Sequence, residues 1–258
     1  MSKSIAILGS GMIGGQTARL VAAAGLEVVV ANTRGPDSLR ELVAELGPTA
    51  RAASAEEAIQ AADIVVVAIP FQAYSKLSPD LLAGKIVIDT MNYYPERDGH
   101  MPEVQTDVLS TSELVQRHLA KSQVVRAFNN LDFVRLRRLA RPAGSTDRSA
   151  VPIAGDDVTA KTAVANLLDV IGYDSVDMGP LAESWRSEPT TPIYVVPFVG
   201  NVPDTVASRD DVMNWYMNTP GYTVTKAEVE GLVAKAERHD RMFGDLDQFK
   251  IKELFGPA

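Results

Sequence analysis

Cysteine is absent from this chain of 258 residues, and only three histidines occur. Without cysteine the protein can form no disulfide, no thiolate metal site and no cysteine nucleophile, so its chemistry must come from a cofactor or from oxygen and nitrogen groups. The histidines, His100, His118 and His239, are dispersed along the chain, and this spacing does not suggest a metal site. We therefore expect no bound metal.

Long apolar runs and positive charge are scarce as well. No run of about 18 apolar residues occurs, and the chain enters an apolar strand at Ser4, which leaves no room for a signal peptide. The formal net charge of −8 argues against a nucleic-acid partner and against a membrane partner, because both favour a basic surface. With 46% hydrophobic residues the chain can bury a full core, and we expect a cytoplasmic protein.

Glycines gather where the first apolar stretch ends. Residues Ser4–Gly14 read SIAILGSGMIG, a short strand that runs into the spacing G-x-G-x-x-G. Gly9 permits a tight turn, Gly11 lets a pyrophosphate approach the backbone, and Gly14 lets the following helix pack against the strand. The unpaired amides at the start of that helix complete an anion site. The helical spacing and second strand that follow favour a dinucleotide-binding turn over an ordinary turn without ligand.

The residues after the second strand indicate which dinucleotide is bound. NAD-binding proteins usually end this strand, here Glu27–Ala31, with a carboxylate that accepts hydrogen bonds from the adenosine ribose. This chain has Asn32 at that place, followed by Thr33 and Arg34. A neutral amide does not repel a 2′-phosphate, and a hydroxyl beside a guanidinium fork suits one. The sequence favours NADP(H) over NAD, although Arg34 by itself is also compatible with a solvated loop arginine.

Apolar stretches of strand length alternate with helical patterns through the first 180 residues. Beyond the first two, the expected strands are Asp63–Ile69, Lys85–Asp89, Gln123–Phe128, Ala150–Ala154 and Asp174–Met178. Ser-x-x-Glu pairs that begin at Ser38, Ser54 and Ser110 predict helix starts. The alternation predicts an α/β fold, a doubly wound, mostly parallel Rossmann-type sheet with helices on both faces. We assign residues 1–180 to this NADP-binding domain and residues 181–258 to a C-terminal helical extension.

Two regions depart from the alternation and are candidates for substrate contacts, because connections tolerate functional residues better than core elements do. The first, Thr90–Gln105, follows the carboxyl end of a strand, where the crevice of an open α/β sheet lies. The second is the tail, which looks helical over Pro180–Tyr194, irregular over Pro197–Pro203, and amphipathic over Asp210–Asn218 and Lys226–Phe243. We expect the tail to pack on the sheet or on a second subunit of a homodimer.

Arginines are concentrated in one short stretch, at Arg135, Arg137, Arg138 and Arg141. Such a run is most often a solvated helix face. An anion-binding rim, which would attract the anionic tail of a coenzyme, is the alternative interpretation. The sequence leaves both open.

A recognisable general acid is missing. Lys161 and Asn166 lie near the place where hydroxyacid dehydrogenases carry a lysine and an asparagine, but the flanking glycines and the spacing differ. Carbonyl reduction by a nicotinamide needs a proton donor, whereas hydride transfer between two organic cofactors mainly needs two rings stacked in near contact. The sequence therefore favours a second organic cofactor.

Six motifs, in their order along the chain, resemble the NADP oxidoreductases that depend on coenzyme F420, a deazaflavin. They are Gly9–Gly14, Asn32–Pro36, Ala68–Phe71, Ala127–Asn130, Ile153–Asp157, and Gly179–Ala182 with Glu188–Pro189. The resemblance spans most of the first 195 residues, and compact members of the family end near the segment matched by Val196, whereas this chain continues to Ala258. The continuation could cover the second-cofactor site, rebuild it for another acceptor, or extend a dimer interface.

On the phosphate side, the resemblance implies that Thr33 and Arg34 hold the 2′-phosphate and that Ser10, Met12 and Ile13 surround the pyrophosphate and the nicotinamide. Together with the motif positions, the expected cofactor-binding residues on this side are Gly9, Ser10, Gly11, Met12, Ile13, Gly14, Asn32, Thr33 and Arg34.

On the nicotinamide side, the resemblance implies that Ile69, Pro70 and Phe71 line the ribose and the ring, and that Asn129 lies at the mouth of the deazaflavin slot. By sequence alone, Pro70 and Phe71 fit equally well as a strand stop and a core aromatic.

The favoured hypothesis is an oxidoreductase that transfers a hydride between NADP(H) and coenzyme F420 or a similar small-molecule acceptor. The first alternative is an NADPH-dependent reductase of a small ketone, imine, quinone or flavin, with Tyr93, Tyr94, His100 and Asp132 as candidate proton donors. The second alternative is a non-catalytic NADP(H)-binding sensor. No catalytic residue is certain from the sequence, and the candidates are Tyr93, His100 and Asn129.

Overall fold

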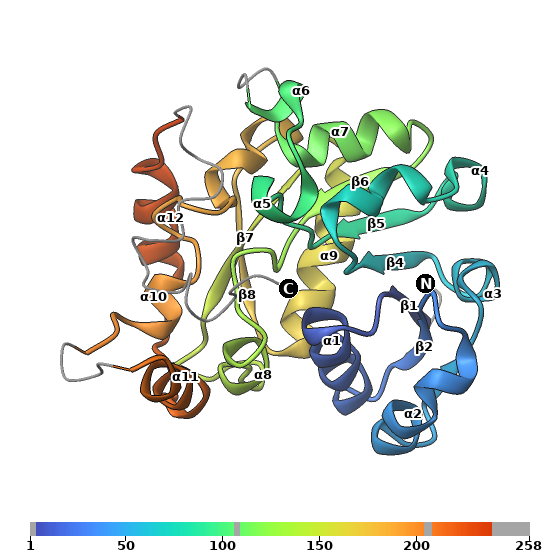
Figure 1. Ribbon diagram of the computed structural model, residues 1–258, viewed down its shortest axis with the longest axis horizontal. Helices are drawn as coiled ribbons and strands as arrows, with labels where there is room; N and C mark the ends of the chain where they lie inside the picture. Colours follow the sequence, from blue (N-terminus) through green and yellow to red (C-terminus); the bar gives the residue numbers. More distant parts are fainter. Residues whose placement is uncertain (1–3, 106–108, 204–207, 239–258) are drawn as a thin grey trace.

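A computed structural model describes residues 4–105, 109–203 and 208–238. Its strands are β1 (Ser4–Leu8), β2 (Glu27–Ala31), β3 (Ala50–Ala52), β4 (Ile64–Val67), β5 (Ile86–Asp89), β6 (Gln123–Arg126), β7 (Ala150–Gly155) and β8 (Asp174–Asp177). They form one sheet in the order β3-β2-β1-β4-β5-β6-β7-β8 (Figure 1). β7 is antiparallel to β6, and the other neighbouring pairs among these strands are parallel. The predicted mostly parallel, doubly wound sheet is confirmed, and only the short edge strand β3 was not predicted.

Helices connect these strands. The first group is α1 (Met12–Ala23), the 3-10 helix η1 (Pro36–Leu39), α2 (Arg40–Leu46), α3 (Ala55–Gln60), the 3-10 helix η2 (Phe71–Lys76) and α4 (Pro79–Leu82). The second group is α5 (Pro95–Asp98), α6 (Pro102–Gln105), α7 (Thr111–His118), α8 (Arg135–Arg138) and α9 (Val158–Ile171). None of the helices within the described ranges has both the length and the apolar character that a membrane span requires.

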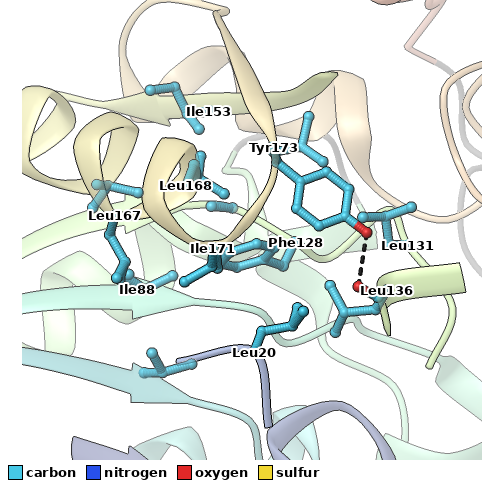
Figure 2. Packing of buried hydrophobic residues seen from close by; sticks show 14 of the residues in the cluster. Leu20, Ile88, Phe128, Leu131, Leu136, Ile153, Leu167, Leu168, Ile171 and Tyr173 are labelled. Carbon is cyan, nitrogen blue, oxygen red and sulfur yellow. Dashed lines mark hydrogen bonds between the residues drawn. The ribbon is translucent and has the colours of Figure 1, made fainter. Parts of the chain in front are cut away.

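The two faces of the sheet carry separate hydrophobic clusters, because alternate residues of a strand point to opposite sides. In β1, Ile5 and Ile7 pack with residues of α1 and α9, whereas Ala6 and Leu8 pack with residues of α3 and α7. Figure 2 shows the first cluster, in which Phe128 lies beneath α9. This arrangement explains why the central strands are apolar along their whole length.

Two of the three predicted capping boxes are confirmed. Ser54 and Ser110 each accept a hydrogen bond from the backbone amide three residues on, and the glutamate at that position bonds back to the serine amide. The prediction for Ser38 is wrong. Ser38 lies inside η1, its hydroxyl donates to the Gly35 carbonyl at 2.7 Å, and α2 begins only at Arg40. The Ser38 hydroxyl is therefore hydrogen-bonded within the turn after β2 and does not cap the helix that the sequence pattern predicted.

The tail is helical, but its elements are shorter than predicted. It contains the 3-10 helix η3 (Leu181–Ser187), α10 (Val196–Val199), α11 (Arg209–Asn218) and α12 (Lys226–Ala234). The expected helix over Pro180–Tyr194 is only η3, the expected irregular stretch includes α10, and α12 stops well before Phe243, which lies outside the described residues with His239. Val229 and Val233 of α12 pack in the same cluster as β7, so the tail does pack on the sheet (Figure 1).

The arginine run is divided between surface and interior: Arg137 and Arg138 are exposed, as a solvated face predicts, whereas Arg135 is buried. Arg135 is fully buried, and its guanidinium lies 4.4 Å from the ring centroid of Tyr216 and donates to the Tyr216 carbonyl at 2.5 Å. Arg138 donates to the Thr219 carbonyl at 3.1 Å, and Arg141 is paired with Asp147 at 2.8 Å. Arg135 and Arg138 thus attach α8 to α11 and the segment after it, a tertiary role that a local charge pattern does not reveal.

Candidate functional site

The turn after β1 is shaped by glycines in two different ways. Gly9 has a positive φ of 105°, and a Cβ there would stand 2.2 Å from the carbonyl oxygen of Ala68. A Cβ on Gly14 would stand 1.9 Å from the carbonyl oxygen of Gly9. At Gly11, by contrast, a Cβ would meet nothing within 4 Å. The protein's own packing therefore requires Gly9 and Gly14 but leaves Gly11 unexplained, and the open space at Gly11 is where the sequence places a pyrophosphate.

The helix that follows the turn presents its first amides to this space. Gly11 precedes α1 and has no side chain with which to cap it, and the first turn of α1 contains no acidic residue. Met12, the first helical residue, is 56% exposed, and Ile13 is half-buried. Uncapped amides at the positive end of a helix of this length attract an anion.

The turn after β2 is held against the glycine turn by one side chain. The Asn32 amide donates to the Ser10 hydroxyl at 2.9 Å and to the Ser38 hydroxyl at 3.0 Å. Its oxygen accepts from the Arg34 amide at 2.9 Å. Asn32 thus holds the two turns in a fixed relation without bringing a negative charge to the place where adenosine ribose is expected.

Thr33 and Arg34 are exposed at the tip of this turn. In the part of the chain that the structure describes, the Arg34 guanidinium forms no ion pair, whereas the nearby Arg40 is paired with Asp37 at 2.6 Å. An exposed arginine with its donors available suits a phosphate on a bound ligand.

On the other side of the turn, the segment after β4 divides between the surface and the core. Ile69 lies next to the glycine turn, and its Cγ2 would be 3.2 Å from a Cβ at Gly9. Pro70 is exposed, whereas Phe71 is fully buried and stacks on Tyr74 at 5.1 Å between ring centroids. Of the two readings that the sequence left open for Phe71, the structure supports the core aromatic.

A polar network lies at the carboxyl ends of β5 and β6. We call it the crevice cluster, and it consists of Asp89, Asn92, Tyr94, Arg126, Asn129, Ser187 and Tyr194. Its base is an ion pair between Asp89 and Arg126 at 3.1 Å, with both side chains at 0% exposure. Arg126 also donates to the Met91 carbonyl at 2.5 Å and to Asn92 Oδ1 at 3.1 Å. The buried charge is thereby used to shape the loop that follows β5.

Asn129, which was expected at the mouth of a second-cofactor slot, is 2% exposed. Both its amide nitrogen and its amide oxygen are hydrogen-bonded. Its amide donates to the Ser187 carbonyl at 2.5 Å and to Asn92 Oδ1 at 3.2 Å, and its oxygen accepts from the Ser187 hydroxyl at 3.0 Å. Asn129 therefore joins the end of β6 to Ser187, the last residue of η3, and is placed to position the cluster.

The two other catalytic candidates lie to one side of the cluster. Tyr93 is fully buried, its hydroxyl donates to the Gly99 carbonyl at 2.7 Å and accepts from the Met101 amide at 3.0 Å, and burial raises its pKa. This geometry makes Tyr93 a loop anchor rather than a proton donor. His100 is exposed in the same loop. Asp132, a further candidate donor, is buried beside Arg135, at 3.4 Å.

Sequence reasoning did not find Ser187 and Tyr194 as members of the site. They bond to residues 58 and 102 positions away in the chain, so no local pattern could have placed them there. A partial signal was available for Asp89 and Arg126. Both are charged, buried residues that directly follow apolar strand residues, a combination that requires pairing.

Comparison with known proteins supports the resemblance seen in the sequence. Residues 4–93 match the family described as NADP oxidoreductase, coenzyme F420-dependent. Over these residues the chain is similar to the F420-dependent NADP oxidoreductases. The expected enzyme class, an NADP-dependent oxidoreductase, agrees with that family, and the matched residues contain the glycine turn and the turn after β2.

Two curated proteins extend the relationship. Metalloreductase STEAP3 of Rattus norvegicus is 31% identical over 196 residues, which are 75% of this chain and 37% of that protein. The F420-dependent NADP reductase of Methanocaldococcus jannaschii is 29% identical over 149 residues, which are 54% of this chain and 64% of that protein. The chain thus spans less than two thirds of the length of these curated relatives.

Solved structures agree with the fold. A hypothetical protein from Sinorhizobium meliloti has a TM-score of 0.64 and 28% identity, covering 74% of this chain and 92% of its own. A candidate F420-dependent NADP reductase from Arthrobacter sp. FB24 has a TM-score of 0.58 and 28% identity, covering 70% of this chain and 86% of its own. The Rossmann-type α/β architecture is therefore shared with these proteins.

Proposed function

We propose that this chain is an oxidoreductase that binds NADP(H) at the glycine turn and transfers a hydride between the nicotinamide and a small-molecule acceptor held against the crevice cluster. The observation that carries the proposal is the open space at Gly11 beside an uncapped helix N-terminus. A diphosphate fits this cradle because a Cβ would fill it and because the surrounding donors are backbone amides. NADP(H), when bound, supplies the hydride, and the chain supplies binding and orientation.

The preference for NADP(H) over NAD(H) rests on the turn after β2. Asn32 is fixed by hydrogen bonds to Ser10, Ser38 and the Arg34 amide and carries no charge, and Arg34 is exposed beside it. The 2′-phosphate would gain charge-assisted hydrogen bonds from the Arg34 guanidinium and from Thr33. The family description and the NADP reductase relative support the same choice.

Calorimetric titration with NADPH and NADH tests the nucleotide proposal. The wild-type protein is expected to bind NADPH more tightly, and Arg34→Ala is expected to weaken NADPH binding about tenfold while leaving NADH binding unchanged, because only the phosphorylated ligand meets the guanidinium. Arg117→Ala, at an exposed arginine in the last turn of α7, is the matched control. Tighter binding of NADH by the wild type, or an equal effect of both variants, would contradict the proposal.

For the acceptor, we propose a deazaflavin of the coenzyme F420 type. The proposal is supported by the family description and by the F420-dependent relative from Methanocaldococcus jannaschii. A planar acceptor that takes a hydride at carbon needs two stacked rings and fixed polar groups at its edge, which the cluster can provide. The metalloreductase relative makes a ferric chelate a useful second acceptor to compare.

The acceptor is tested by mixing enzyme, NADPH and oxidised deazaflavin and following the deazaflavin absorbance. Reduction at a rate proportional to enzyme concentration supports the assignment. Parallel reactions with a flavin, a quinone, a ketone, an imine and a ferric chelate identify another acceptor if the deazaflavin is not reduced. Tight NADPH binding with no oxidation by any member of this panel would instead support the non-catalytic sensor.

A further inference from the structure

Tyr94 links the two sides of the crevice. Its backbone amide donates to Asp98 Oδ2 at 2.9 Å, and the other oxygen of the same carboxylate accepts from the Gln72 amide at 3.4 Å. Gln72 directly follows Phe71, so Tyr94 is tied through Asp98 to the segment where the nicotinamide is expected. Its hydroxyl meets the hydroxyl of Tyr194, which comes from the tail. Tyr94 is partly exposed, whereas Tyr93 and Tyr194 are buried.

The orientation of the Asn92 amide follows from neighbouring groups that can only donate or only accept a hydrogen bond. Arg126 can only donate, so the atom of Asn92 that faces it is Oδ1, and the Asn129 carbonyl can only accept, so the atom that faces it is Nδ2. Asn92 Nδ2 also lies 3.4 Å from the Tyr194 hydroxyl oxygen, to which it can only donate. When the Tyr194 oxygen accepts from Asn92, its own hydrogen is available to the Tyr94 oxygen. Either hydroxyl can donate in this contact, and when Tyr194 donates, the hydrogen of Tyr94 points away from Tyr194.

The ring of Tyr94 is held as firmly as its hydroxyl. The Arg97 guanidinium lies 4.9 Å from the ring centroid, donates to the Asn92 carbonyl at 2.6 Å and is paired with Asp98 at 2.8 Å. A cation over the ring and a carboxylate on the backbone amide leave Tyr94 little freedom to rotate. A donor fixed in this way loses little entropy when a ligand arrives.

Backbone strain surrounds the same network. Phe128, Thr190 and Val195 are the non-glycine residues with positive φ among the described residues, at 62°, 74° and 56°. Phe128 precedes Asn129, and Val195, which is β-branched, follows Tyr194. Strained residues persist where surrounding contacts over-determine them, and they cluster at functional sites. The position of Tyr194 is thus imposed by the fold.

We propose that the Tyr94 hydroxyl is the hydrogen-bond donor that holds the hydride acceptor, and that Tyr194 and Asn92 position it. The inference rests on the proposed function. When NADPH gives its hydride to the electrophilic carbon of a deazaflavin, ketone or imine and becomes NADP+, the electron pair of the acceptor's double bond moves to its oxygen or nitrogen, where negative charge develops until that atom takes a proton from water. A fixed phenol donor aimed at that atom stabilises the charge. Burial raises the pKa of Tyr94, so the hydroxyl stays protonated and acts as a donor without giving up its proton.

The test compares Tyr94→Phe, Tyr194→Phe and the control Tyr222→Phe, which removes a hydroxyl from a tyrosine that is 61% exposed. With the acceptor identified by the turnover panel, Tyr94→Phe is expected to lower kcat about 10- to 100-fold, the size of a hydrogen bond to a charged group. The affinity for NADPH, measured by titration, should stay within about twofold because Tyr94 does not hold the nucleotide. Tyr194→Phe should give a smaller loss of kcat, and Tyr222→Phe none.

Each outcome separates the two proposals. If the wild type turns over no acceptor, the proposed function fails and the role of Tyr94 with it. If the wild type is active and Tyr94→Phe matches Tyr222→Phe, only the role of Tyr94 is overturned. Equal losses of kcat and NADPH affinity would mark Tyr94 as structural and would also overturn it. Should Tyr94→Phe not fold, 3-fluorotyrosine at position 94 keeps the shape and strengthens the donor, and kcat must then be kept or raised.

Discussion

The glycine turn and the crevice cluster lie at the same edge of one sheet and are built in opposite ways. The turn after β1 offers backbone amides and is defined by side chains that are missing, with Gly11 facing open space. The crevice cluster is defined by side chains that are present, joined by hydrogen bonds across as many as 102 positions of the chain. A phosphate site can be made from a short local segment, whereas a shaped polar site for an acceptor needs residues from several elements.

The difference also concerns charge. Near the glycine turn, the half-buried Arg19 of α1 pairs with the exposed Glu45 at 2.5 Å. In the crevice cluster the ion pair between Asp89 and Arg126 is fully buried. Removal of one partner from a buried pair leaves an uncompensated charge in the interior, while removal of an exposed charge leaves its partner in water.

The largest expected effect tests this contrast directly. Arg126→Leu is expected to lower the free energy of unfolding by about 3–5 kcal/mol, because Asp89 would remain buried without its cation. Arg19→Leu, the matched control, leaves the exposed Glu45 in water and is expected to cost at most about 1 kcal/mol. Urea unfolding followed by circular dichroism measures both. Similar losses for the two variants would show that the cluster does not depend on its buried pair.

A smaller effect should distinguish the glycine that the packing requires, Gly14, from the glycine that faces open space, Gly11. Gly14→Ala is expected to lower the free energy of unfolding by about 1–3 kcal/mol, because the new Cβ would be forced against the Gly9 carbonyl oxygen. Gly11→Ala is expected to leave stability nearly unchanged but to weaken NADPH binding at least about tenfold, because the methyl group occupies the phosphate space. Thermal unfolding and NADPH titration of both variants measure the two effects. Wild-type NADPH affinity in Gly11→Ala would remove the main support for the nucleotide site.

The smallest expected effect concerns pH and distinguishes the cluster from the turn. Burial raises the pKa of Tyr194 above the ordinary value of about 10. At a pH between the ordinary pKa and the raised pKa of the folded state, Tyr194 loses its proton in the unfolded chain and keeps it in the folded chain. The stability that the buried, protonated Tyr194 contributes is therefore fully present below about pH 10. As pH rises further, the free energy of unfolding falls by up to about 1.4 kcal/mol per pH unit for this residue.

Tyr194→Phe should therefore show a shallower loss of melting temperature between about pH 10 and 11 than the wild type. Tyr222→Phe, which alters an exposed tyrosine, should keep the wild-type slope. Thermal unfolding at several pH values, with tyrosinate absorbance recorded in parallel, makes the comparison. An unchanged slope in Tyr194→Phe would contradict the burial of its hydroxyl.

Much of the fold was predictable because its signals are local. The strand positions follow from apolar runs, and the helix starts at Ser54 and Ser110 follow from a four-residue pattern. The failures share one cause. Ser38 fits the same pattern, yet its hydroxyl is taken by Gly35 and Asn32, and Arg135 looks like a surface arginine but is buried against Tyr216. In both cases the competing partner cannot be recognised from neighbouring residues.

By itself, the sequence determined the α/β alternation, the glycine turn and the absence of a carboxylate after β2, since each depends on residues close together in the chain. Only the tertiary structure decided which polar residues share the crevice, because Asn92, Asn129 and Tyr194 meet through strands and a tail that pack by burial rather than by local pattern. The tertiary structure also decided that packing requires Gly9 and Gly14, whereas Gly11 faces open space that a ligand can use. That distinction depends on which atoms would surround a Cβ at each position.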